Sequence, residues 1–162
     1  VLLYPRPGEL RFSTWSEFDL EKAVWTIPAE RMKMRREHKK PLSKLAVDIL
    51  TELKLFTADA PLAFPSLIAR AKPLSENTLN QSLRRMGFDK TEATSHGFRS
   101  SASSLLNESN LWNPDAIEAE LAHKVRDQIR GAYMRTPFWD ERVRMAEWWS
   151  EQVREMAATW SI

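Results

Sequence analysis

Residues 24–43 read VWTIPAERMKMRREHKKPLS, and this stretch decides the fold that we expect for the chain. Trp25 and Ile27 alternate with less apolar neighbours, and Leu42 follows a run of basic residues. Because alternation with a period of two is typical of a half-buried strand, the stretch predicts a small antiparallel hairpin or three-stranded sheet. Its turn carries the positive charge.

The basic turn has two interpretations. Residues 31–44 hold seven Lys or Arg against one Glu, whereas elsewhere acids and bases are interleaved. A solvated loop is the ordinary explanation of such a run, and a surface that meets a polyanion is the other. The formal net charge of +2 does not by itself require a polyanionic partner, so the two interpretations stay open at this point.

Helices are predicted on both sides of the sheet. Ser43 can cap a helix of about 13 residues, in which Leu45, Ile49 and Leu53 recur at helical spacing. Before the sheet, Pro7 suits the start of a short helix from Gly8 to about Thr14. After the first long helix, prolines between residues 57 and 74 predict a loop. Further helices are predicted from Ser75 to Met86, over 97–107, from Asn113 with Pro114 at the first position, over 127–133, and from Trp139 onward.

The last predicted helix carries a long apolar stripe. The stripe consists of Trp139, Val143, Ala146, Trp149, Val153, Met156 and Trp160. It can pack into the core or dock a neighbouring subunit, and the sequence does not decide between these alternatives.

Composition bounds the class of protein. The chain has 162 residues, 43% hydrophobic content and four Gly, which indicates one domain, mainly α with a small antiparallel β-sheet (α+β). There is no Cys, which excludes disulfides, thiolate metal sites and a Cys nucleophile. No apolar run approaches the length of a membrane span, so we expect a soluble, cytoplasmic protein without a membrane partner. Because the chain opens on apolar residues without a helix cap, we expect residues 1–162 to form one domain truncated at its N-terminal end.

Five short segments carry the chemistry. In chain order they are R6-P-G-E9, Lys33 in the basic turn, H96-G-F-R99, L121-A-H123 and G131-A-Y133. His-x-x-Arg alone is a weak signal, because the chain has a second copy at His123 and Arg126. The ordered set is more informative than any one segment.

This ordered set resembles the catalytic domain of the tyrosine recombinases, most closely the phage and prophage integrases, over nearly the whole chain. The resemblance implies that fold and a site-specific recombinase that cleaves and rejoins DNA through a 3′-phosphotyrosine, without metal, ATP or cofactor. It implies Arg6, Lys33, His96, Arg99, His123 and Tyr133, the nucleophile, as catalytic residues, with Glu9 as a supporting acid. It also implies double-stranded attachment-site DNA as partner, a homo-tetramer in the synaptic complex, and a bacterial protein that is nucleoid-associated when on DNA. The basic turn would then contact DNA through Arg31, Arg35, Arg36, Lys39 and Lys40.

Two positions depart from the family pattern. Tyr4 and Pro5 stand where the family usually has Thr and Gly, and Ala122 replaces the commoner Gly of L-G-H. Both departures lie next to predicted catalytic residues, so they bear on local backbone geometry.

The residue types suit attack by a phenol on a phosphodiester. Two guanidiniums, Arg6 and Arg99, can stabilise the extra negative charge on the phosphate without a metal ion. A Tyr hydroxyl has a reference pKa of about 10, so it needs a base, for which His96 is the candidate. His123 would donate a hydrogen bond to the phosphate, and Lys33 would protonate the departing 5′-oxygen.

Other functions stay possible. A type IB topoisomerase shares this chemistry on a similar domain, and plasmid relaxation would distinguish it from an integrase. A helical DNA-binding or interaction module without catalysis would use only the basic turn and the apolar stripe. Histidines that only satisfy core hydrogen bonds, and arginines in surface ion pairs, are the corresponding structural alternatives.

Overall fold

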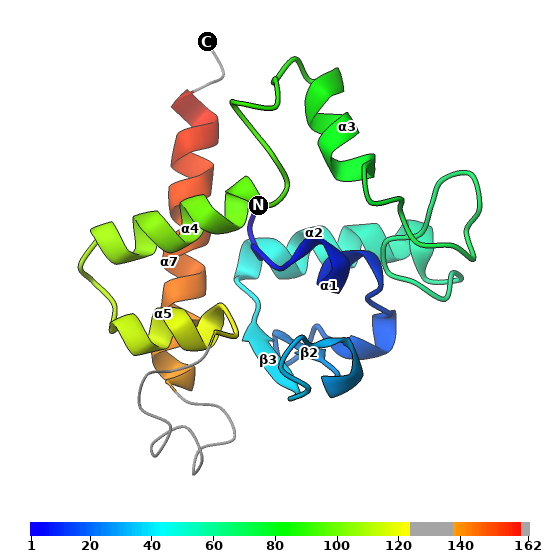
Figure 1. Ribbon diagram of the computed structural model, residues 1–162. Helices are drawn as coiled ribbons and strands as arrows, with labels where there is room; N and C mark the ends of the chain where they lie inside the picture. The colour runs from blue at the N-terminus through cyan, green and yellow to red at the C-terminus, as the bar shows by residue number, and fades with distance from the viewer. Residues whose placement is uncertain (124–137, 160–162) are drawn as a thin grey trace.

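The computed structural model describes residues 1–123 and 138–159 of the chain. The sheet, α1 and α2 lie on one side, α4, α5 and α7 lie on the other, and α3 stands apart from both groups (Figure 1). The first residues of the chain pass between the two groups. This arrangement places three predicted catalytic segments, which begin at Arg6, His96 and Leu121, along the junction of the two groups.

The sheet has three short antiparallel strands in the order β1-β2-β3. They are β1 (Phe18–Asp19), β2 (Val24–Ile27) and β3 (His38–Pro41), with 3₁₀ turns η1 (Trp15–Glu17) and η2 (Ala29–Arg31) beside them. Trp25 lies opposite Lys40, and Thr26 lies opposite Lys39. Trp25 and Ile27 are fully buried, as their alternation predicts, so the three-stranded alternative is confirmed.

Two helices support this sheet. α1 (Pro7–Arg11) is shorter than predicted, because the Ser13 backbone already bonds to Leu10 and to Ala63 of the following loop. α2 (Lys44–Thr57) begins as predicted, with the Ser43 hydroxyl oxygen accepting a hydrogen bond from the Ala46 amide at 3.3 Å. Ala46 and Leu50 of α2 pack on the buried side of the sheet and form the first core with it.

The remaining helices follow the predicted order. They are α3 (Thr78–Arg85), α4 (Gly97–Glu108), α5 (Pro114–Glu120) and α7 (Trp139–Thr159). α3 begins after Ser75, because Asn77 occupies the cap position while the Ser75 and Thr78 hydroxyls bond to each other at 2.8 Å. Asn113 caps α5 as predicted, accepting from the Asp115 amide at 2.9 Å. The helix predicted over 127–133 lies outside the described residues.

The buried face of α7 differs from the predicted stripe. Val143 and Met156 are 38% and 43% exposed, so the core-packing alternative holds for only part of the stripe, at Trp149 and Val153. The buried residues are Arg142, Met145, Trp149 and Ser150. The face is rotated because Arg142 finds a buried acidic partner, which a search for apolar residues alone misses.

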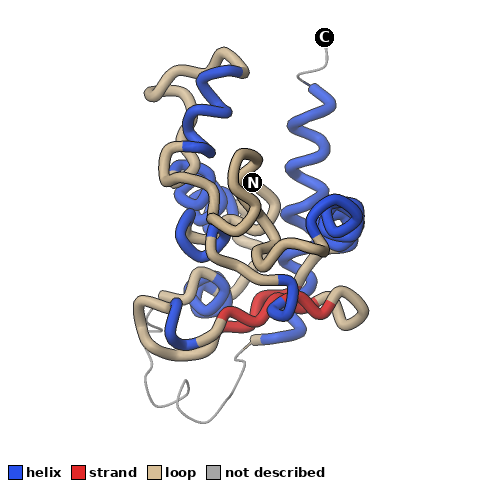
Figure 2. The backbone as a smooth tube through the Cα atoms, turned by 90° about the vertical axis from the view of Figure 1, so that its right-hand side faces the viewer, coloured by secondary structure: helices blue, strands red, loops and turns tan. Residues whose placement is uncertain are grey.

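α7 therefore closes the second core. Its Met145 and Trp149 pack with Tyr4, with α4 through Ala102 and Leu106, and with α5. Figure 2 shows the strands side by side at one end of the molecule, with α7 extending away from them. None of the described helices is long and apolar enough to cross a membrane.

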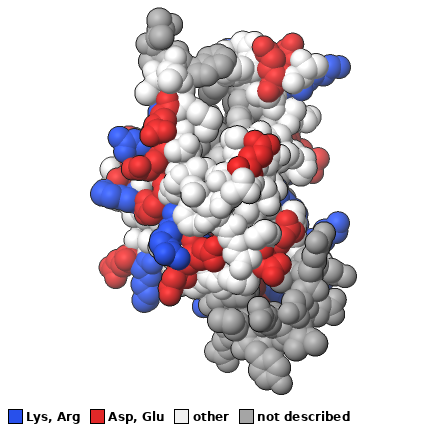
Figure 3. All heavy atoms as spheres, turned by 90° about the vertical axis from the view of Figure 1, so that its left-hand side faces the viewer, with Lys and Arg blue, Asp and Glu red and all other residues white. Residues whose placement is uncertain are grey.

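The face formed by α4, α5 and α7 is mixed in charge. Figure 3 shows acidic and basic side chains interspersed around an uncharged area, with no field of one sign. A polyanion would find no uniformly positive surface on the part of this face that is described.

Candidate active site

Arg6 is fixed at the start of α1 by an acid three residues later. The Arg6 guanidinium bonds to one oxygen of Glu9 at 2.8 Å, and the Arg6 amide bonds to the other at 2.9 Å. Glu9 is 6% exposed, so the pair is partly shielded from water. The contact expected between these two residues is present, and it limits the directions in which the guanidinium can point.

The backbone before Arg6 is unusual. Tyr4 has a φ of 34°, and Ala122, the second position that departs from the family pattern, has a φ of 50°. Both values lie in the left-handed region, which side chains other than glycine adopt at a cost of about 1–2 kcal/mol. The two positions that depart from the family pattern therefore have a strained backbone next to the site.

Arg99 lies in the first turn of α4 and is only 6% exposed. Its guanidinium donates to the Tyr4 carbonyl at 3.1 Å and to the Leu121 carbonyl. These acceptors are neutral, and no carboxylate among residues 1–123 and 138–159 forms an ion pair with Arg99. Its positive charge is thus left for an incoming anion.

The two arginines are close enough to influence each other. Burial lowers the pKa of Arg99, and repulsion by Arg6 lowers this pKa further. A guanidinium starts from such a high pKa that it stays ionised at neutral pH. Two positive charges therefore converge at the junction of α1 and α4.

His123 completes this group. Its Nε2 lies 3.2 Å from the Arg99 guanidinium, and its Nδ1 lies 3.0 Å from a carboxylate oxygen of Glu118. Because a guanidinium only donates, Nε2 accepts and Nδ1 carries the proton that bonds to Glu118. Glu118 orients the ring, and nothing in the sequence pattern pointed to this residue.

His96 is the N-cap residue of α4 and is exposed. Its carbonyl accepts from the Arg99 amide at 3.1 Å, while its imidazole makes no hydrogen bond to any residue in the described ranges. The ring lies three residues before Arg99 at a helix start, and it is accessible to a ligand that reaches Arg99.

Lys33 lies in the turn between η2 and β3 and is exposed. Of the two methionines beside it, Met32 is 3% exposed and anchors the turn, whereas Met34 is 42% exposed. Within the described part of the chain the Lys33 ammonium has no ion-pair partner, so it can move toward a ligand.

Two of the five predicted DNA contacts in the basic turn need correction. Arg31 donates to the Glu9 carbonyl at 2.8 Å and pairs with Glu17, and Lys40 is 2% exposed and pairs with Glu120. Lys40 is buried and Arg31 is 20% exposed, and each is paired with an acid distant in sequence, so we leave both out of the proposed DNA-binding set. Arg35, Arg36 and Lys39 are exposed and stay predictions.

Tyr133 lies outside the described residues. The other tyrosine, Tyr4, is 3% exposed, with its ring 4.6 Å from the Lys40 ammonium and 5.8 Å from the Trp149 ring. Burial raises the pKa of Tyr4 well above its ordinary value. A hydroxyl in this position is poorly suited to attack a phosphate at the surface.

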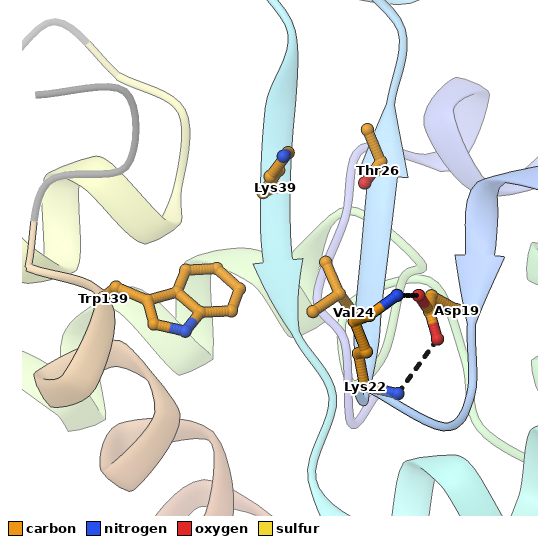
Figure 4. A pocket seen from close by; sticks show the side chains of 6 residues that line it. All are labelled: Asp19, Lys22, Val24, Thr26, Lys39 and Trp139. Atoms are coloured by element: carbon orange, nitrogen blue, oxygen red, sulfur yellow. Dashed lines mark hydrogen bonds and ion pairs between the residues drawn. The ribbon is translucent and has the colours of Figure 1, made fainter.

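A shallow pocket lies on the outer face of the sheet. Figure 4 shows it between the strands and the start of α7, lined by Asp19, Lys22, Val24, Thr26, Lys39 and Trp139. Lys22 is paired with Asp19 at 2.7 Å, and no predicted catalytic residue lines the pocket. Among the described residues there is also no cluster of three His, Asp or Glu that could hold a metal ion.

Comparison with known proteins gives a consistent family. The model of the phage integrase family matches residues 5–137. The integrase of Enterobacteria phage P4 is 44% identical over 165 residues, which cover 93% of this chain and 38% of that protein. The prophage integrase IntA of Escherichia coli K12 is 40% identical, covering 95% of this chain and 37% of its own length.

A solved structure shares the fold. The crystal structure of XerA recombinase superposes with a TM-score of 0.61 at 19% identity, covering 93% of this chain and 54% of that one. The chain thus spans about two fifths of the integrases that it matches and about half of the structural neighbour.

Proposed function

The chain belongs to the phage integrase family of tyrosine recombinases, and from that premise we propose that it is an integrase catalytic domain that cleaves and rejoins DNA through a 3′-phosphotyrosine on Tyr133. The observation that carries the proposal is the convergence of Arg6, Arg99 and His123, with no carboxylate of the described residues in an ion pair with Arg99. Such a group suits a phosphate that gains negative charge in the transition state.

In the proposed cleavage step, the Tyr133 oxygen attacks the phosphorus and the bond from phosphorus to the 5′-oxygen breaks. The DNA is left with a 5′-hydroxyl. His96, exposed beside Arg99, takes the phenol proton, and Lys33 gives a proton to the departing oxygen. Rejoining reverses these transfers. The phosphotyrosine conserves the energy of the broken bond, so rejoining does not require ATP. Arg6 and Arg99 would stabilise the charge on the phosphate in place of a metal ion.

His123 changes partner in this scheme. Its Nε2 accepts from Arg99 in the free protein, so it can donate to a phosphate oxygen only as an imidazolium. Glu118 can hold Nδ1 in either protonation state, which keeps the ring aimed at the same point. The burial of Tyr4 further supports Tyr133 as the nucleophile.

The proposed partner is double-stranded attachment-site DNA, bound by a homo-tetramer in the synaptic complex of a bacterial cell. The names and organisms of the similar integrases, from a phage and from Escherichia coli K12, support the bacterial setting. Arg35, Arg36 and Lys39 would contact phosphates beside the reacting one, because all three are exposed around the turn that carries Lys33.

The test is covalent capture on DNA. Nicked duplexes that carry the attachment site of the encoding element, incubated with the chain, should give a protein-DNA adduct on denaturing gels. Tyr133→Phe should abolish the adduct and leave DNA affinity nearly unchanged, because only the attacking oxygen is lost. The wild-type yield should be the same in excess EDTA. An adduct that persists in Tyr133→Phe, that maps to Tyr4, or that requires magnesium would overturn the proposal.

A further inference from the structure

A buried ionic cluster lies directly behind the candidate active site. Lys40, Glu120 and Arg142 are each 2% exposed. One Glu120 oxygen pairs with the Lys40 ammonium, and the other accepts from Arg142 Nε at 2.7 Å. The three residues come from β3, the end of α5 and the first turn of α7, so one carboxylate joins three elements.

Main-chain bonds strengthen the same junction. The Glu120 carbonyl accepts from the Lys40 ammonium at 3.2 Å and lies 3.2 Å from His38 Nε2. Arg142 also donates to the Lys39 carbonyl. Burial, together with the Lys40 charge, lowers the pKa of His38 to about 3, so this ring is neutral and donates to the carbonyl.

Each of the three elements leads to a predicted catalytic residue. The carbonyl of Leu121, next to Glu120, holds Arg99, and His123 follows two residues later. β3 is the strand that returns from the turn carrying Lys33. Arg142 stands nine residues after Tyr133, at the start of the helix that follows the tyrosine.

Stability alone is a weak reason for such a cluster. Moving three charges out of water is costly, and apolar side chains of similar volume often stabilise a core as well or better. Buried ionic groups are best attested where they fix the register of neighbouring elements. Attraction from Lys40 and Arg142 outweighs the effect of burial and lowers the pKa of Glu120, so it stays a carboxylate.

We propose that Glu120 is a positioning residue, which holds β3, the Arg99–His123 segment and α7 in one register so that Lys33, His123 and Tyr133 meet at the same phosphate. This inference rests on the proposed function. It assigns to Glu120 an effect on the rate of cleavage of bound DNA, separate from its effect on folding.

The first test is Glu120→Gln, which keeps the shape and removes the charge. Single-turnover cleavage of nicked attachment-site DNA, at saturating protein, should fall about 10²-fold, the usual cost of misplacing reacting groups by about 1 Å. DNA affinity, measured by fluorescence anisotropy, should stay within about threefold, because the exposed basic residues are unchanged. The loss should therefore appear in the cleavage rate and not in binding.

Two controls separate positioning from instability. Leu50→Ala removes a buried side chain from the first core, away from the cluster, and matches a general loss of stability. At a temperature below the melting temperatures of Leu50→Ala and Glu120→Gln, Leu50→Ala should cleave at close to the wild-type rate. Glu120→Gln leaves two buried cations without a carboxylate, and the double variant Lys40→Met, Glu120→Gln removes one of these cations. The amide oxygen of the new glutamine can still accept a hydrogen bond from Arg142. The double variant should melt higher than Glu120→Gln alone and still cleave about 10²-fold slowly.

The outcomes distinguish this inference from the proposed function. If the wild-type chain forms no adduct, the proposed function fails and the inference fails with it. If the wild type forms the adduct and Glu120→Gln cleaves as fast as Leu50→Ala, only the inference is overturned. Recovery of the wild-type rate in the double variant would also overturn it, because Glu120 would then act through stability alone.

Discussion

Lys33 and Lys40 belong to one basic segment and end in opposite environments. Lys33 is exposed in the turn and has no ion-pair partner in the described part of the chain, whereas Lys40 is 2% exposed and pairs with Glu120. Arg31 and Arg35 repeat the contrast, since Arg31 pairs with Glu17 and Arg35 is exposed. Between residues 31 and 40, the two basic residues at the ends, Arg31 and Lys40, are turned inward, and the basic residues between them are exposed.

The difference shows that a run of like charges is not a single functional unit. The ends of the run lie where the hairpin joins the body, and each meets an acid from elsewhere in the chain. The middle lies in the turn, which only Met32 anchors. The paired basic residues, Arg31 and Lys40, therefore stabilise the fold, whereas the exposed basic residues of the turn are free to contact a ligand.

The largest expected effect tests the outward lysine. Lys33→Ala should slow cleavage of ordinary DNA by about 10²- to 10⁴-fold, the usual contribution of a general acid. Its free energy of unfolding should change by less than about 0.5 kcal/mol, because the exposed side chain makes no ion pair within the described residues. A substrate with sulfur at the 5′-bridging position needs no proton on its leaving group, so it should restore most of the lost rate.

Matched variants decide whether Lys33 is the acid. Arg6→Ala and Arg99→Ala should stay slow on both substrates, because their proposed role is to stabilise charge on the phosphate. Lys39→Ala should bind DNA more weakly because it loses a phosphate contact, but at saturating protein it should show no gain from sulfur beyond that of the wild type. Rescue by sulfur in Lys39→Ala, with none in Lys33→Ala, would mean that the acid has been misassigned.

The second effect tests the inward lysine. Lys40→Ala should lower the free energy of unfolding by about 3 kcal/mol, the lower end of the cost of breaking a buried ion pair, because Glu120 keeps Arg142 as a partner. Urea unfolding followed by tryptophan fluorescence measures this loss, with Lys39→Ala as the control on the same strand. Equal stability of the two variants would show that the buried pair does not hold the sheet to α5.

Local patterns predicted much of the fold, and long-range pairs account for what they missed. The caps at Ser43 and Asn113 and the alternation at Trp25 depend on neighbours in sequence, and the structure confirms them. The stripe on α7 is buried only in part, and the core also includes Arg142, which pairs with an acid that no local pattern selects. Helix caps and strand alternation can be predicted from residues that are neighbours in sequence. Ion pairs between distant segments cannot, because they form only in the assembled fold.

The contacts of the candidate site also differ in whether the sequence could predict them. The contact between Arg6 and Glu9 and the approach of His123 to Arg99 were both available only through the resemblance to a family. Glu118 and Glu120 carried no signal, because an acid near the end of a short helix ordinarily faces water. The roles given to all these residues, and to Tyr133, stay predictions that the adduct assay tests.

The smallest expected effect concerns the arginines of the segment. Arg35 and Arg36 are exposed, so each substitution by alanine should remove one phosphate contact and reduce the slope of log K against log salt by about 0.9. Arg31→Ala should leave that slope unchanged, because its guanidinium is occupied by Glu17 and the Glu9 carbonyl. It should instead cost about 1.5–3 kcal/mol of stability, the usual worth of hydrogen bonds to a charged group. Anisotropy titrations over a range of salt concentrations, with urea unfolding in parallel, measure both quantities. A reduced slope in Arg31→Ala at unchanged stability would place this arginine on DNA, and the division between an inward and an outward part of the basic segment would fail at that end.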